Sequence, residues 1–215
     1  MKKQILFLSF SLFLIACNTP FDNTKKTGYF KIDFPKKKYQ LFDDPTFPYS
    51  FEYPTYAKIV KDSSTFFDNN PENVYWRNID FMQFNAKIFL SYKQIGGNAL
   101  YKIKLPNGTY KDSIGRNEFD KMIADANRLT NKNVEKATSI KDSLFKTESN
   151  ISGVVFRLKG DVATQRQFFM TDTTKNFIRG ALYFYASPKD DSLQPVVNFI
   201  QQDIDHMINT FKWKR

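Results

Sequence analysis

Three segments near the carboxyl end read Ile151-Ser-Gly-Val-Val-Phe-Arg-Leu158, Gln165-Arg-Gln-Phe-Phe-Met-Thr171 and Phe177-Ile-Arg-Gly-Ala-Leu-Tyr-Phe-Tyr185, and they decide the fold. Val, Ile, Phe and Tyr dominate them, and these residues favour strands. Gly160-Asp161 and the polar run 172–175 lie between the segments and are typical of turns. Because tight turns join antiparallel neighbours, the segments predict three consecutive antiparallel strands.

An amphipathic helix is predicted after these strands. Ser192 can cap its first turn, and Pro195 is acceptable in that turn because a first-turn N–H has no helical partner. Three- and four-residue spacing places the apolar residues on one stripe, which comprises Val196, Val197, Ile200, Ile204, Met207, Ile208 and Phe211. The stripe predicts that this helix packs on the sheet.

The amino-terminal half adds strands and a second helix. Aromatic and β-branched segments predict strands at 29–34, 49–53, 57–60, 74–81 and 86–92. Pro106-Asn107-Gly108 predicts a hairpin or loop tip within 104–115. Asn117 can cap a helix whose apolar face comprises Phe119, Met122, Ile123, Ala126 and Leu129.

This order of elements predicts the α+β class. We expect one domain, 28–215, with a mostly antiparallel sheet flanked by two main helices. By analogy alone, the order is similar to the PsbP/Mog1-like sandwich.

The amino terminus predicts secretion and a lipid anchor. Lys2 and Lys3 precede an apolar run at 5–15, which as a helix would rise about 16 Å, too short for a bilayer core of about 30 Å. This pattern is typical of a signal peptide, here 1–16. Leu14-Ile15-Ala16-Cys17 resembles the bacterial lipobox, so Cys17 is predicted to be acylated, for example by palmitate, and to begin a polar tether, 17–27.

The charge and cysteine content limit the possible partners. Cys17 is the only cysteine, so no disulfide within the chain is possible. The formal net charge is +10, but the lysines are scattered, and an exported protein rarely meets nucleic acid. We therefore expect the lipid bilayer, and no nucleic acid, among the partners.

Few residues suit catalysis or metal binding. His206 is the only histidine and is expected to be an exposed helical residue. No HExxH, CxxC, GxSxG or Walker A pattern occurs, so the sequence predicts no metal, no cofactor and no enzyme activity. Asp33, Glu52 and Asp80 lie in aromatic strands and leave open an alternative, a cell-wall glycan binder or hydrolase. A small-ligand carrier is a further alternative, which would need a deep apolar pocket.

Four aromatic residues are candidates for partner binding. Phe66-Phe67 and Tyr75-Trp76 lie in or beside a long loop, where adjacent rings are not easily buried together. Phe66, Phe67, Tyr75 and Trp76 either contact a partner or pack the loop onto the fold, and the sequence leaves both possibilities open.

Several ordered stretches resemble the gliding-motility lipoprotein GldD family of the Bacteroidetes. The resemblance covers nearly the whole mature chain and rests on these stretches: Gly28-Tyr-Phe-Lys-Ile-Asp-Phe-Pro35, Pro48-Tyr-Ser-Phe-Glu-Tyr-Pro54, Trp76-Arg-Asn-Ile-Asp-Phe81, Gln167-Phe-Phe-Met-Thr-Asp-Thr-Thr-Lys175, Arg179-Gly-Ala-Leu-Tyr-Phe184, Asp191-Ser-Leu-Gln-Pro-Val196 and Phe211-Lys-Trp213. The stretch 102–114 is longer than expected for that family.

The resemblance implies a non-enzymatic component of the gliding and type IX secretion apparatus that acts as an assembly or interaction module. Its expected partners are envelope proteins of that machinery. Of the residues, only Cys17 takes a role from the family, as the lipidated residue. No acidic run follows Cys17, which favours the periplasmic face of the outer membrane over surface display.

Overall fold

The computed structural model describes residues 32–61, 74–185 and 190–214, and for 190–192 the backbone alone. Residues 33–215 form one compact unit. The predicted signal peptide, the tether and the start of the predicted domain lie outside the described residues. None of the described helices is long and apolar enough to cross a bilayer.

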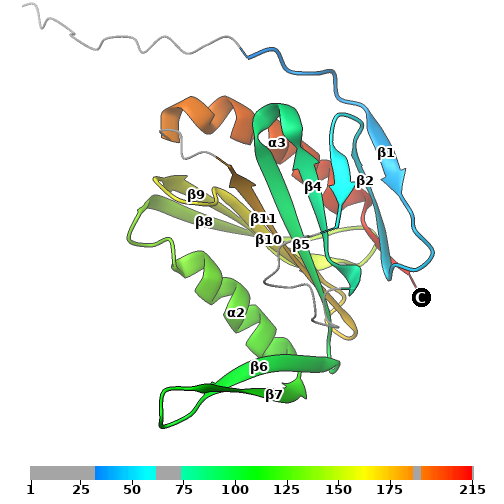
Figure 1. The fold of residues 1–215 in the computed structure, drawn as a ribbon. Helices are drawn as coiled ribbons and strands as arrows, with labels where there is room; N and C mark the ends of the chain where they lie inside the picture. The colour runs from blue at the N-terminus through cyan, green and yellow to red at the C-terminus, as the bar shows by residue number, and fades with distance from the viewer. Residues whose placement is uncertain (1–31, 62–73, 186–189, 215) are drawn as a thin grey trace, which may run out of the picture. The chain divides into compact units, whose positions relative to one another are not determined.

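The described chain is α+β with mostly antiparallel sheets, as predicted (Figure 1). Its elements run in the order β1 (Tyr39–Phe42), β2 (Tyr49–Pro54), β3 (Lys58–Val60), β4 (Arg77–Phe81), η2 (Met82–Phe84), β5 (Ala86–Gln94), β6 (Asn98–Lys104), β7 (Tyr110–Arg116), α2 (Phe119–Asn131), β8 (Ala137–Lys146), β9 (Ser152–Gly160), β10 (Arg166–Thr171), β11 (Asn176–Phe184), α3 (Asp190–Thr210) and β12 (Lys212–Trp213).

The main sheet has seven strands in the order β3-β4-β5-β11-β10-β9-β8. The three predicted carboxyl-terminal strands are its antiparallel neighbours β9, β10 and β11. β11 also pairs with β5, which joins the two halves of the chain at the centre of the sheet. A second sheet has the order β1-β2-β12, and β6 and β7 form a separate hairpin.

The α-helices α2 and α3 of the described residues lie against opposite faces of the main sheet (Figure 1). α2 covers the β9–β10–β11 part of one face, where Met122 and Ala126 join a core cluster with Phe156 and Phe169. α3 lies on the other face beside β2. Every member of its predicted apolar stripe is buried. Hydrophobic burial on both faces therefore holds the layers together.

Some element boundaries differ from the prediction. Residues 32–34 form no strand, and the first strand is β1 instead. Asn117 does not cap α2; its side chain is buried and donates a hydrogen bond to the Asn98 carbonyl at 3.1 Å. α3 begins at Asp190, so Pro195 lies inside the helix rather than in its first turn. The predicted loop tip at Pro106-Asn107-Gly108 joins β6 to β7.

Candidate functional site

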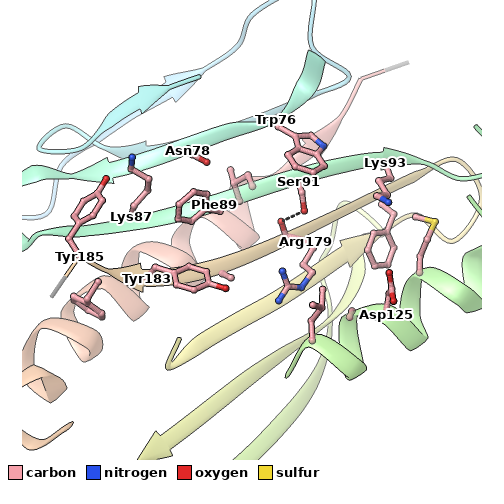
Figure 2. Close-up of a pocket in the computed structure, with 17 residues that line it drawn as sticks. Trp76, Asn78, Lys87, Phe89, Ser91, Lys93, Asp125, Arg179, Tyr183 and Tyr185 are labelled. Carbon is pink, nitrogen blue, oxygen red and sulfur yellow. Dashed lines mark hydrogen bonds between the residues drawn. The ribbon is translucent and has the colours of Figure 1, made fainter. Parts of the chain in front are cut away.

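A pocket of about 550 Å³ lies on the face of the main sheet that α2 covers only in part (Figure 2). Side chains of β4, β5, β11 and α2 line it, together with Trp76 just before β4 and Tyr185 just after β11. Ligand sites in proteins are usually concave and mostly apolar, with a few polar groups placed to orient the ligand. The pocket matches this description, because apolar atoms dominate its lining.

Strand alternation produces the pocket. Ile88, Leu90 and Tyr92 of β5 point to the buried α3 side of the sheet, and the residues between them point to the α2 side. β11 pairs with β5 so that Ala181 lies opposite Phe89, and Arg179 opposite Ser91. Because α2 covers this second face only over β9, β10 and β11, the face stays open above β4 and β5.

Aromatic rings form much of the pocket wall. The Phe89 and Tyr183 rings meet edge to face, with centroids 5.4 Å apart. The Trp76 indole N–H donates to the Tyr92 carbonyl at 2.8 Å, which holds the ring against β5. Tyr185 lies 5.2 Å from the Lys87 ammonium, measured to the ring centroid. These contacts hold several of the rings in place, so part of the wall is already formed.

Three cationic side chains, Lys87, Lys93 and Arg179, line the pocket with one carboxylate, Asp125. Burial lowers the pKa of Arg179 below its usual value, and its guanidinium donates to Gln167 Oε1. Burial also acts to lower the pKa of Lys87, but Tyr185 and Asp80 outweigh it and the pKa is raised. The Lys87 ammonium lies 3.6 Å from an Asp80 carboxylate oxygen.

The predicted partner-binding aromatics do not form one surface in the described chain. Trp76 lines the pocket, whereas Tyr75 packs on the other side among Phe47 and Tyr92, with ring centroids 5.6 Å and 5.5 Å away. The Tyr75 carbonyl also accepts a hydrogen bond from Tyr49. Phe66, Phe67 and the predicted lipidation site, Cys17, lie outside the described residues.

The strand carboxylates considered for glycan chemistry are separated. Glu52 lies in the three-stranded sheet and Asp80 in the seven-stranded sheet, and Asp33 precedes β1. Glu52 Oε2 lies 2.7 Å from His206 Nε2, and Asp80 faces Lys87. A glycosidase needs two carboxyl groups on either side of one bond, and the described residues do not present such a pair from these three.

His206 differs from the exposed residue that the sequence predicts. It pairs with Glu52, and its ring stacks on Tyr39 with centroids 3.5 Å apart. It therefore helps to join α3 to β1 and β2. No group of three or more His, Cys, Asp or Glu side chains in the described ranges could hold a metal ion.

The segment before β1 is fixed to α3 by a buried carboxylate. Asp203 is 2% exposed and accepts hydrogen bonds from Lys37 at 2.7 Å, Tyr39 at 3.1 Å and Tyr56 at 2.7 Å. Phe34 adds a stacked contact with Phe199, with centroids 4.5 Å apart. The chain is thus attached firmly to the fold only a short distance after the predicted tether.

Sequence reasoning did not find the pocket residues Arg179, Lys87 and Phe89. The sequence did carry a signal for them, because Arg179 lies in the middle of an otherwise apolar strand. In β5, moreover, apolar residues alternate with a second set of positions that includes Lys87, Phe89, Ser91 and Lys93. The pairing of β5 with β11, which brings these residues together, cannot be read from either segment alone.

The fold and the pocket define an α+β protein whose main sheet is packed on one face and has an open, cationic and aromatic pocket on the other. The family model of the gliding motility lipoprotein GldD matches residues 21–213, so the chain belongs to the GldD family. The resemblance noted in the sequence is therefore confirmed. Membership makes the chain a membrane-anchored lipoprotein of the cell envelope and a component of gliding motility.

A search of the curated proteins found no similar sequence. Among solved structures, the chain is similar to the cyanobacterial PsbP protein CyanoP from Synechocystis, with 10% identity and a TM-score of 0.43. The match covers 91% of this chain and 99% of CyanoP. CyanoP is a PsbP, the kind of protein named in the sequence-based analogy, and the similarity concerns the fold alone.

Proposed function

We propose that the chain is a non-enzymatic interaction module that assembles or stabilises the gliding and type IX secretion apparatus. Lipidation at Cys17 would hold it at the membrane, and we place it at the periplasmic face of the outer membrane. Lys37 lies twenty positions after Cys17, so the attached part of the fold stays within about 70 Å of the anchor. Such a tether raises the local concentration of the module near membrane partners.

The hairpin of β6 and β7 is the observation that carries this proposal. Its strands pair only with each other among the described residues. Its large apolar side chains are between 39% and 70% exposed, namely Leu100, Tyr101, Ile103, Tyr110 and Ile114. Neighbouring exposed apolar residues of this kind mark sites of protein contact. Figure 1 shows the hairpin beside the amino-terminal end of α2, away from the α3 face of the main sheet.

The hairpin also indicates the chemistry of its partner. Leu100 lies directly opposite Ile114 in the strand register, so the two side chains form one apolar pair on one face. Strand alternation places Lys102, Lys104, Arg116 and Asp112 on the same face as this pair, and Lys111 on the opposite face with Ile103. A partner with an apolar centre and an acidic rim would complement this surface.

Crosslinking in cells followed by identification of the attached proteins tests the proposal. We expect the double change Leu100→Ser and Ile114→Ser to remove envelope proteins of the gliding machinery from the crosslinked set. Leu144→Ser is the matched control, because Leu144 is 84% exposed on β8, outside the hairpin. An unchanged crosslinked set with the hairpin variant, in a folded protein, would contradict the assignment of the hairpin.

The loop aromatics give an independent arm of the same experiment. Phe67→Ala and Trp76→Ala, each made alone because Trp76 lines the pocket, should remove partners if these loop aromatics take part in binding. If no envelope protein depends on either surface and the purified chain instead sediments with peptidoglycan or cleaves it, the interaction-module proposal is wrong and the glycan alternative replaces it.

A further inference from the structure

The Arg179 guanidinium forms no ion pair with a carboxylate among the described residues. Burial lowers its pKa, and the Asp125 charge is near enough to act against this larger effect and raise it. Its side chain is half-buried at the centre of the main sheet, and its hydrogen bond goes to the neutral amide oxygen of Gln167. Asp125, the carboxylate of the pocket lining, instead forms an ion pair with Arg128 at 2.9 Å. A charge removed from water is normally matched by an opposite charge, so this site favours a bound anion.

The surroundings strengthen this preference. Lys87 and Lys93 come from β5 and line the same pocket (Figure 2). Lys93 lies opposite Phe177 in the register, next to the pair formed by Ser91 and Arg179. The site is half-enclosed and partly shielded from solvent, which strengthens the attraction of its cations for an anion, although the Lys87 charge is already matched by Asp80 at 3.6 Å.

The rest of the lining suits an apolar body. Met122, Ala126 and Leu129 come from α2, and Phe89 and Ala181 come from the sheet. A volume of about 550 Å³ lies within the range found for small-molecule sites and is too small for a folded partner. The planar guanidinium matches the two oxygens of a carboxylate, which it can bind through two parallel hydrogen bonds.

We infer that this pocket binds a fatty carboxylate, with the acyl chain against the α2 and β5 side chains and the carboxylate paired with Arg179. The inference goes beyond the proposed assembly role, because it assigns a small-molecule site to a different surface from the β6–β7 hairpin. Either surface can therefore fail its test without affecting the other.

Isothermal titration of residues 33–215 with sodium decanoate, in the absence of detergent and below the micelle concentration, tests this site. We expect saturable binding of one decanoate per chain. Arg179→Gln should weaken decanoate binding about tenfold or more, because it removes a charge-assisted pair. It should leave the weaker binding of 1-decanol unchanged, because the alcohol has the same chain and no charge. Arg157→Gln is the matched control, since Arg157 lies on β9 outside this pocket.

A second variant keeps the test decisive if Arg179→Gln does not fold. Ser91 is half-buried and lines the pocket beside Arg179, so Ser91→Phe should fill the space and abolish the binding of both probes. Its fold is checked by circular dichroism. The inference is overturned if the parent protein shows no saturable decanoate binding. It is also overturned if Arg179→Gln binds decanoate as tightly as the parent, or if folded Ser91→Phe retains both ligands.

Discussion

Replacing Asp203 with Asn should destabilise the fold strongly. The carboxylate is almost fully buried, and it is the shared acceptor for Lys37, Tyr39 and Tyr56. An amide of the same shape removes the charge and can accept only part of these hydrogen bonds. The Lys37 ammonium, whose side chain is 23% exposed, then keeps the Phe199 carbonyl, at 2.8 Å, and the Tyr56 hydroxyl, at 3.0 Å, as acceptors but has no opposite charge beside it.

Breaking a buried ion pair by removing one partner costs about 3–5 kcal/mol. Because Lys37 retains some solvent contact and two neutral acceptors, the lower end applies, and we expect a loss of about 3 kcal/mol. For a domain of this size, the melting temperature should fall by about 6–12 °C. Urea unfolding followed by circular dichroism measures the free energy directly.

Two control variants separate the buried charge from other effects. Asp205→Asn changes an exposed acid of the same helix and should alter the free energy of unfolding by less than about 0.5 kcal/mol. Asp203→Leu with Lys37→Met removes both charges and should be less destabilised than Asp203→Asn, because no unpaired ammonium remains. A parent-like stability of Asp203→Asn would refute this reasoning, and so would a double variant that is no more stable than Asp203→Asn.

Three further predictions concern the core, a turn and the anchor. Gly180→Ala should lower the free energy of unfolding, measured in urea, by about 2 kcal/mol or more, because a Cβ there would lie 2.0 Å from the Phe168 ring. Adding Phe168→Leu should recover part of the loss. A Gly180→Ala variant as stable as the parent would contradict the packing. Burial raises the pKa of Asp172, but hydrogen bonds from the backbone of 174–176 outweigh it and the net shift is downward. Asp172 therefore stabilises the fold above pH 3.8 and loses this contribution as the pH falls through its folded-state pKa. Asp172→Asn should lower the free energy of unfolding by about 1–2 kcal/mol at pH 7 and by much less at pH 3. An equal loss at both pH values would exclude the charge as the cause. Cys17→Ser should move the folded protein from the membrane fraction to the soluble fraction, and continued membrane retention on cell fractionation would show that acylation is not the anchor.

The strands that sequence analysis identified correctly are those buried on at least one face. β9, β10 and β11 carry apolar residues in nearly every position, because β10 is buried throughout and its neighbours almost so. β8 was missed, since it is an edge strand whose residues are largely exposed and whose composition is polar. β1 was missed for the same reason. Exposure at the edge of a sheet removes the hydrophobic pattern on which such predictions depend.

Predictions for individual polar residues failed where the fold supplies a distant partner. His206 lies beside the apolar stripe of α3, where a histidine is usually solvated, yet β1 and β2 cover it with Tyr39 and Glu52. Asp203 is buried by the same layer. Nothing in the spacing along the helix indicates that a second sheet packs over its polar side.

The sequence by itself determined the α+β class, the closing helix and the family, because periodicity and ordered motifs are properties of neighbouring residues. It also predicts the lipid anchor at Cys17. Only the tertiary structure decided that Arg179 faces a pocket with Lys87 and Phe89, residues some ninety positions earlier in the chain. The physical reason is register: a shift of one residue in the β5–β11 pairing would turn these side chains to the opposite face, and long-range packing alone selects the register.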